Sequence, residues 1–135
     1  MIRSETNIRV RYAETDQAGY VYYGNYAQYY EIARVETMRQ LGLNYSEMEK
    51  NGVIMPVLSM QIKYIKPAFY DDLLKINTII EEIPETRMLF KYEIFNQNGI
   101  LINIGETVLT FISKETHRPC RAPAWFIKGL KPHFQ

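Results

Sequence analysis

The sequence has 135 residues, with one cysteine, one tryptophan, two histidines and no long run of apolar residues. A single thiol, Cys120, cannot form a disulfide within the chain, which favours a reducing compartment. The N-terminal segment lacks the apolar stretch of a secretory signal, and no segment approaches the roughly 20 apolar residues of a membrane-spanning helix. We therefore expect a soluble cytoplasmic protein.

An excess of charge of one sign is also absent. Sixteen basic and fifteen acidic residues give a net charge of +1, so the chain lacks the composition typical of nucleic-acid or membrane-surface proteins. His117 and His133 have no partner pattern, and no cluster of residues has the spacing of a metal site. We expect neither a metal nor a cofactor. This length predicts one domain, residues 1–135.

Aromatic residues, in contrast, are abundant. Six of the eleven tyrosines lie between Tyr20 and Tyr30. Their rings could form an aromatic acyl pocket, or they could pack in the core and in a subunit interface, and the sequence leaves both possibilities open. Because there is no basic groove to accompany them, a stacking surface for single-stranded nucleic acid is not expected.

The segment from Arg11 to Gly42 predicts the end of a strand, a tight loop and one long helix. We expect this helix to run from about residue 24 to residue 41. Asn25, with a glutamine three residues later, resembles a capping box, and Gly42 between two leucines fits a Schellman stop. Asp16, in the loop, precedes the positively polarised end of the helix.

Strands are predicted on both sides of this segment. Ile8, Val10 and Tyr12 alternate with arginines, which is typical of a half-buried first strand. After a short helix near residue 45, four segments are rich in β-branched and aromatic residues, namely 53–66, 72–82, 86–96 and 100–114. One or two helical turns are expected near residues 123–127. The order predicts an α+β fold in which a five-stranded antiparallel sheet curls around the long helix.

Apolar residues cover more than one side of the predicted long helix. The spacing of a buried stripe is met by Tyr26, Tyr30, Ala33, Thr37 and Leu41. Three further apolar residues lie off that stripe, namely Ile32, Val35 and Met38. Such a helix favours a second neighbour, and a partner subunit is the simplest candidate.

Two patterns in this segment resemble a known family. They are Asp16-x-x-Gly19-x-Val21-x-Tyr23-x-x-Tyr26 and Glu31-x-Ala33-Arg34-x-Glu36. Together with segments 63–68, 71–74 and 116–119, which follow in the expected order, they resemble the 4-hydroxybenzoyl-CoA thioesterase-like family of hotdog-fold acyl-CoA thioesterases. The resemblance implies a hotdog fold, hydrolysis of an acyl-CoA thioester to a free acid and CoA, and homodimers or homotetramers paired through their sheet edges.

The resemblance also implies roles for two residues. The matching aspartate of the family attacks the thioester carbonyl or activates water for that attack, and both roles stay open for Asp16. By itself, an aspartate in such a loop is more typical of a turn that binds local backbone. The backbone N–H at the position of Tyr23 polarises the thioester oxygen in the family. Several relatives carry His or Phe there, so the phenol of Tyr23 receives no role.

Basic and acidic residues outside the loop are less specific. Arg87, Arg118 and Arg121 occupy places comparable to those from which relatives bind the CoA phosphates, and arginine suits phosphate geometry. Exposed arginines are equally common on any protein surface. Because Asp16 is present, we expect solvated or ion-paired roles for Glu31 and Glu36.

Three other functions stay open: a thioesterase for acyl carrier protein, a hotdog dehydratase, and a non-catalytic acyl-CoA-binding module. A dehydratase needs a histidine-centred site, and the loop and helix contain no histidine. A binding module needs no carboxylate beside the carbonyl, so Asp16 favours an enzyme. The sequence does not identify the acyl group.

Overall fold

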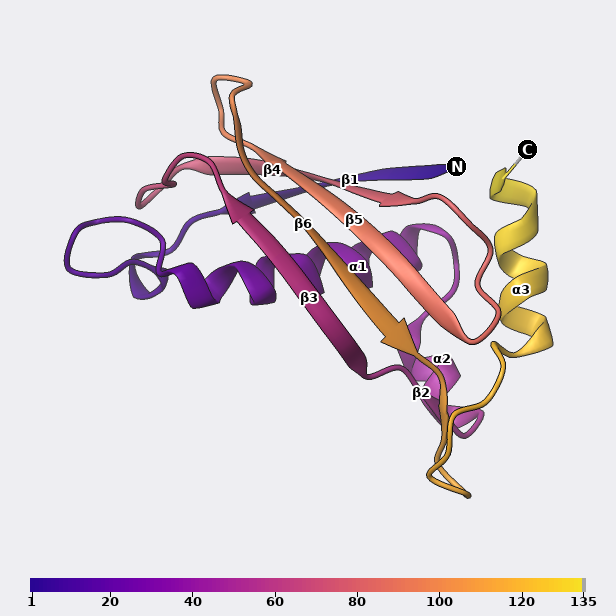
Figure 1. Ribbon diagram of the computed structural model, residues 1–135. Coiled ribbons are helices and arrows are strands. Elements are labelled where there is room, and N and C mark those ends of the chain that lie inside the picture. The colour runs from indigo at the N-terminus through magenta and orange to yellow at the C-terminus, as the bar shows by residue number, and fades with distance from the viewer. Residues whose placement is uncertain (135) are drawn as a thin grey trace.

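The computed structural model describes residues 1–134, in which a five-stranded antiparallel sheet curls around one long helix (Figure 1). The strand order is β1-β4-β5-β6-β3. The strands are β1 (Ile2–Arg9), β3 (Val57–Tyr64), β4 (Leu73–Ile80), β5 (Arg87–Phe95) and β6 (Leu101–Thr110). The predicted α+β architecture is confirmed, and the four later strands fall inside the predicted segments.

Shorter elements complete the fold. Strands β2 (Val53–Ile54) and β7 (Ile112–Ser113) pair with each other beside the main sheet. The α-helices are α1 (Tyr26–Gln40), α2 (Tyr45–Lys50) and α3 (Ala124–Leu130). The 3₁₀ helices are η1 (Tyr12–Glu14), η2 (Tyr23–Asn25) and η3 (Lys131–Phe134). The predicted short helix after the long one and the closing helical turns are confirmed.

The first strand ends earlier than its alternating pattern predicts. Val10 is buried and still bonds to the neighbouring segment, because its N–H donates to the carbonyl of Asp72 and its carbonyl accepts from Asp71 N–H. The chain then turns into η1, and Tyr12 is 78% exposed. The prediction that Tyr12 belongs to the half-buried strand was wrong, since the turn removes it from the sheet.

The predicted capping box at the start of the long helix was also wrong. Helical geometry already begins with η2, so Asn25 has φ −73° and ψ −16° and makes no side-chain cap bond. Its Nδ2 instead donates to the carbonyl of Glu14 at 2.7 Å. The amide therefore ties the helix start to the preceding loop rather than capping the helix.

The end of α1 follows the predicted Schellman motif. Gly42 has φ +75°, which a residue with a side chain rarely adopts. Leu43 N–H donates to the carbonyl of Met38 at 2.8 Å, and Gly42 N–H donates to that of Arg39 at 3.0 Å. Leu43 is buried. The motif thereby satisfies two carbonyls that the helix would otherwise leave unpaired.

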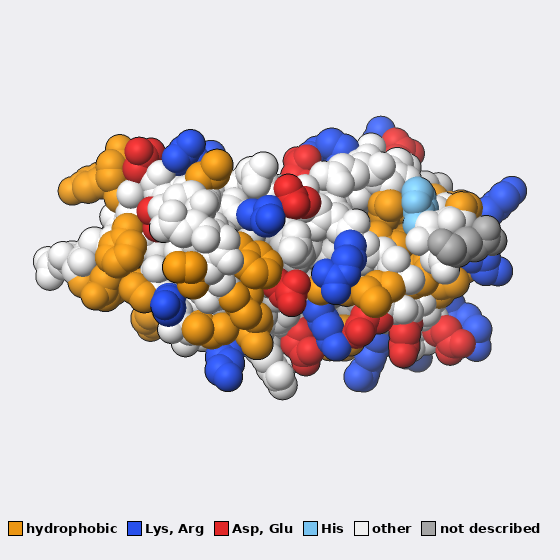
Figure 2. All heavy atoms as spheres, turned by 90° about the horizontal axis from the view of Figure 1, so that it is seen from above, with side chains coloured by type: hydrophobic (Ala, Val, Ile, Leu, Met, Phe, Trp, Pro, Cys, Tyr) orange, Lys and Arg blue, Asp and Glu red, His pale blue; other side chains and the backbone are white. Residues whose placement is uncertain are grey.

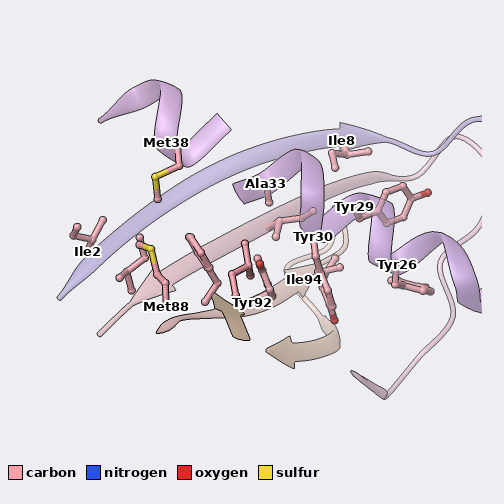
Figure 3. Packing of buried hydrophobic residues seen from close by; sticks show 14 of the residues in the cluster. Ile2, Ile8, Tyr26, Tyr29, Tyr30, Ala33, Met38, Met88, Tyr92 and Ile94 are labelled. Atoms are coloured by element: carbon pink, nitrogen blue, oxygen red, sulfur yellow. The ribbon is translucent and has the colours of Figure 1, made fainter. Parts of the chain in front are cut away.

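The core lies between α1 and the sheet, as Figure 3 shows. The ring of Tyr30 stacks on that of Tyr92 in β5, with centroids 4.3 Å apart. The buried residues of α1 are Tyr26, Tyr29, Tyr30, Ala33, Arg34, Thr37 and Met38. This face is wider than the predicted stripe, so Met38 is covered by the chain itself, whereas Ile32 is 42% exposed.

The core also contains a chain of polar side chains. Arg34 Nη1 donates to the hydroxyl of Tyr92 at 3.1 Å, and that hydroxyl lies 2.7 Å from Thr107 Oγ1. The hydroxyl of Tyr30 donates to Asn103 Oδ1. Buried polar groups are costly without partners, so these bonds fix α1 in one position over β5 and β6.

The strand β3 forms an uncovered edge of the sheet. It pairs only with β6 within the main sheet, and four of its apolar side chains are exposed by 43–51%. These residues are Val57, Leu58, Met60 and Tyr64. An apolar strand edge of this kind is a template for pairing with another strand.

The close packing of Tyr30 yields a stability prediction. A Cβ added to Gly105 would lie 2.6 Å from ring atoms of Tyr30, which is fully buried against Tyr92 and cannot swing away. We expect Gly105→Ala to lower the free energy of unfolding by about 1–3 kcal/mol, measured by denaturant titration. In the matched control, Gly24→Ala, the added Cβ meets the half-exposed ring of Tyr22, which is free to move. Equal stability of Gly105→Ala and the wild type would contradict this packing.

Candidate active site

The loop before η2 is a small closed hairpin. Tyr22 N–H donates to the carbonyl of Glu14 at 2.8 Å, and Asp16 N–H donates to the carbonyl of Tyr20 at 2.8 Å. Gly19, with φ +82°, makes the turn possible, and its N–H donates to the carbonyl of Asp16 at 3.0 Å. These bonds fix the spacing between the two sides of the loop.

The hairpin is also attached to the connection between β3 and β4. Val21 N–H donates to the carbonyl of Ala68 at 2.8 Å. The rings of Tyr20 and Phe69 meet edge to face, with centroids 5.3 Å apart. The loop therefore lies at the end of the sheet where β3 ends and β4 begins, on the left in Figure 1.

The carboxylate of Asp16 is held by one oxygen. Its Oδ1 accepts hydrogen bonds from Ala18 N–H at 2.9 Å and Tyr20 N–H at 3.3 Å. This is the turn role that an aspartate in such a loop predicts. Within residues 1–134, Oδ2 has no hydrogen-bond partner, and the residue is exposed. The turn thus orients the carboxylate and leaves one oxygen available for another molecule.

The backbone N–H of Tyr23 is available as well. Tyr23 is the first residue of η2, and no acceptor in the described part of the chain takes its N–H. The carbonyl of the same residue, which belongs to the following peptide group, accepts a hydrogen bond from the hydroxyl of Tyr64 at 3.1 Å. The carbonyl of Tyr22, in the same peptide group as the Tyr23 N–H, accepts from Asn25 N–H at 2.9 Å. Unpaired N–H groups at a helix start carry partial positive charge and favour an oxyanion.

Asp16 and Tyr23 face the same hollow, of about 400 Å³. Its other lining residues are Tyr20, Val21, Tyr26, Tyr64, Ile65, Lys66 and Pro67. Burial raises the pKa of Tyr26 to about 12, so this ring stays neutral at physiological pH. Figure 2 shows hydrophobic side chains gathered at the left end of the molecule, whereas charged side chains dominate the other end. The hollow is therefore mainly apolar, with one carboxylate and one lysine.

The six clustered tyrosines divide into two groups. Tyr26, Tyr29 and Tyr30 are buried under the sheet, and only Tyr26 of these three lines the hollow. Tyr20, Tyr22 and Tyr23 remain 43–63% exposed around the loop. Tyr29 and Tyr30 therefore pack in the core, whereas Tyr20, Tyr23 and Tyr26 line the hollow.

The three candidate CoA-binding arginines do not meet Asp16 within one chain. Arg87 begins β5, and Arg118 and Arg121 follow β7, all at the opposite end of the sheet from the loop (Figure 1). A strand of eight residues spans roughly 26 Å, which separates the two ends. Arg87 also shares its hollow with three carboxylates, those of Glu81, Glu82 and Glu85, which weakens its attraction for phosphate.

Other candidate residues have simple environments. Glu36 forms an exposed ion pair with Arg39, as expected for the face of a helix. Glu31 lines a separate hollow beside α2. Within residues 1–134, no group of three or more histidine, cysteine, aspartate and glutamate side chains could hold a metal ion. None of the helices in this part of the chain is long and apolar enough to cross a membrane.

Sequence reasoning missed two residues that shape this site. Tyr64 donates a hydrogen bond from β3 to the carbonyl of Tyr23, and Glu14 joins the loop to the helix. Tyr64 belongs to one of the segments that carry the family resemblance, which was a usable signal. Glu14 gave no signal of its role, because its partners are the backbone and a tyrosine fifteen residues away.

Comparison with known proteins identifies the family. A sequence model of the thioesterase-like superfamily matches residues 10–130. YneP of Bacillus subtilis is 38% identical over 116 residues, which are 86% of this chain and 84% of YneP. The chain belongs to the thioesterase-like superfamily. The acyl-CoA thioester hydrolase YbgC of Escherichia coli is 30% identical over 124 residues, 92% of each chain.

A solved structure agrees with this membership. The DHNA-CoA thioesterase of Staphylococcus aureus has a TM-score of 0.89 and 39% identity, covering 100% of this chain and 97% of that one. The predicted hotdog thioesterase family and fold are therefore confirmed, and so is the prediction that the protein is an enzyme, a thioester hydrolase.

Proposed function

We propose that this protein is an acyl-CoA thioesterase in which Asp16 and the backbone N–H of Tyr23 act on the thioester group. The observation that carries this proposal is that both residues line one hollow, and that within residues 1–134 neither Oδ2 of Asp16 nor the N–H of Tyr23 has a hydrogen-bond partner. The names of the relatives YbgC and DHNA-CoA thioesterase support acyl-CoA as the substrate class.

The chemistry needs few groups. The N–H of Tyr23 would stabilise the negative charge that develops on the thioester oxygen. A thiol has a pKa of about 8.5, so CoA leaves as a thiolate without strong general-acid help. The remaining requirement is an attacking oxygen, which Oδ2 of Asp16 either is or generates from water. The mainly apolar walls of the hollow would strengthen the electrostatic effects of the Tyr23 N–H and of the Asp16 carboxylate.

Two mechanisms for Asp16 stay open. As a nucleophile, its oxygen would form an anhydride with the acyl group, which water then hydrolyses. As a general base, it would take a proton from the attacking water. A single turnover in ¹⁸O-labelled water tests the nucleophilic mechanism, because label enters Asp16 only when water attacks the aspartyl carbonyl of an anhydride.

The substrate is tested with a panel of thioesters. Release of free thiol from acyl-CoA esters of different acyl groups would identify the preferred acid. The same acyl group on pantetheine and on acyl carrier protein distinguishes a CoA enzyme from a carrier-protein enzyme. A non-catalytic binding module would bind acyl-CoA and release no thiol from any member of the panel, and that result would overturn the proposed function.

We further propose that the active protein is a homodimer paired through β3, and that two dimers form a tetramer. The exposed apolar side chains of β3 support pairing through this strand, since pairing removes an open sheet edge. Antiparallel pairing about a two-fold axis would bring the start of the partner's β3 beside the end of this one. The partner's Arg87, Arg118 and Arg121 would then lie toward the hollow of Asp16, which is the arrangement we propose for binding the CoA phosphates.

We also propose a cytoplasmic location, because the free thiol of Cys120 suits a reducing compartment. We also propose that residues 1–135 act as one hotdog domain, which the match over residues 10–130 supports. No metal or cofactor is needed for the proposed reaction, since the carboxylate and the peptide N–H supply its chemistry.

The first functional prediction concerns Asp16→Asn. The amide oxygen still accepts from Ala18 and Tyr20 N–H, so the loop and the melting temperature should be preserved. We expect kcat for the best thioester of the panel to fall by on the order of 10² to 10⁴, with a smaller change in binding. Asp71→Asn, the same change at another exposed aspartate, is the control and should keep wild-type kcat. Wild-type turnover by Asp16→Asn would exclude Asp16 from the mechanism.

The second functional prediction separates the side chain of Tyr23 from its backbone. Tyr23→Phe should leave kcat nearly unchanged, whereas Tyr23→Pro removes the N–H and should lower kcat by on the order of 10² to 10³. Proline is compatible with the first helical position, and Tyr22, with φ −58° and ψ 132°, already has the conformation that a following proline requires. An inactive Phe variant beside an active Pro variant would assign the role to the phenol instead.

The third prediction concerns assembly. Wild-type protein should be a dimer or larger by light scattering at micromolar concentration. Met60→Asp places a charge on the exposed edge of β3, where it should not disturb the monomer but should prevent pairing and lower activity. Ile100→Asp, at a similarly exposed position in the β5–β6 turn, serves as the control. A monomeric wild type that retains full activity would contradict the proposed dimer.

A further inference from the structure

Glu14 is the most heavily bonded residue of the loop. Its Oε1 accepts from Arg11 N–H at 2.8 Å and from the hydroxyl of Tyr29 at 2.9 Å. Its carbonyl oxygen accepts from Tyr22 N–H at 2.8 Å and from Asn25 Nδ2 at 2.7 Å. One residue thereby connects the segment after β1, the two sides of the hairpin, and the helix.

These bonds reach both halves of the proposed site. Glu14 lies two residues before Asp16 on one side of the hairpin. Tyr22 and Asn25, which donate to its carbonyl, lie on either side of Tyr23 in the sequence. A displacement of Glu14 would therefore change the position of Asp16 and of the Tyr23 peptide relative to each other.

The bond from Tyr29 gives this arrangement a rigid support. Tyr29 is completely buried, and its ring meets that of Tyr26 edge to face, with centroids 5.7 Å apart. Burial, and next the bond to Glu14, raise the pKa of Tyr29, so its phenol remains protonated and keeps donating. Hydrogen bonds to an ionised group are stronger than bonds between neutral groups. The carboxylate is thus held by a side chain anchored in the core.

We propose that Glu14 and Tyr29 are positioning residues, which set the distance between the Asp16 carboxylate and the Tyr23 N–H without contacting the substrate. This inference rests on the proposed function. A displacement of about 1 Å at reacting groups can lower a rate by on the order of 10². The loop from Asp16 to Tyr20 is exposed, and the bond between Glu14 and Tyr29 is a direct link from this loop to the buried face of α1.

The first test is Tyr29→Phe, which removes the hydroxyl and keeps the ring. We expect kcat to fall at least about tenfold, with KM changed less than about twofold because the walls of the hollow are preserved. The matched control is Tyr92→Phe, which also removes a buried, hydrogen-bonded phenol but lies away from the loop. It should lower the melting temperature and keep kcat. Wild-type kcat in Tyr29→Phe, or an equal loss of kcat in both variants, would overturn the proposal.

The second test uses Glu14, which is only partly buried, so its variants should fold. Glu14→Gln retains an oxygen that can accept from Arg11 and Tyr29, and kcat should stay within about fivefold of wild type. Glu14→Ala removes both bonds, and kcat should fall as in Tyr29→Phe. Equal kcat values for Gln and Ala variants, measured well below their melting temperatures, would contradict positioning through these bonds. Asp16→Asn reports on the proposed function separately, because its loss of turnover does not depend on Glu14.

Discussion

The hydrogen bonds that close the loop onto the start of α1 are the interaction on which the site depends. Asp16 and Tyr23 are seven residues apart, and the bonds from Asp16 N–H to the Tyr20 carbonyl and from Tyr22 N–H to the Glu14 carbonyl hold the two sides of the loop together. The helix start supplies an unpaired N–H, and the hairpin places Asp16 at the hollow that Tyr23 also lines. One short loop, closed by backbone hydrogen bonds, thus carries both groups.

The sheet explains why the site lies at one end of the molecule. Because α1 runs across the sheet with Tyr30 stacked on Tyr92, its first turn is fixed near the end of β3. The same packing leaves β3 uncovered on its outer edge, with apolar side chains exposed. In the proposed dimer, a partner paired on β3 would cover the exposed strand edge and would also extend the walls of the hollow that Asp16 lines.

Elements governed by local pattern were predictable from the sequence. Alternating strands, the Gly42 stop and the Asp16 loop each follow from short-range rules, and the structure contains all three. Tyr12 and Asn25 were misassigned because tertiary bonds override their local preferences: the chain turns at η1, and the Asn25 amide is taken by Glu14. Arg87, Arg118 and Arg121 lie at the end of the sheet opposite the Asp16 loop. Their position follows from the sheet topology, which no local sequence pattern specifies.

The central claim is that the thioester binds between the Asp16 carboxylate and the Tyr23 N–H. A crystal structure of Asp16→Asn with its preferred, unhydrolysed acyl-CoA tests this most directly. We predict that the thioester oxygen lies within hydrogen-bond distance of Tyr23 N–H, with the thioester carbon beside the side chain at position 16. A thioester bound elsewhere, or one whose oxygen points away from Tyr23 N–H, would contradict the account.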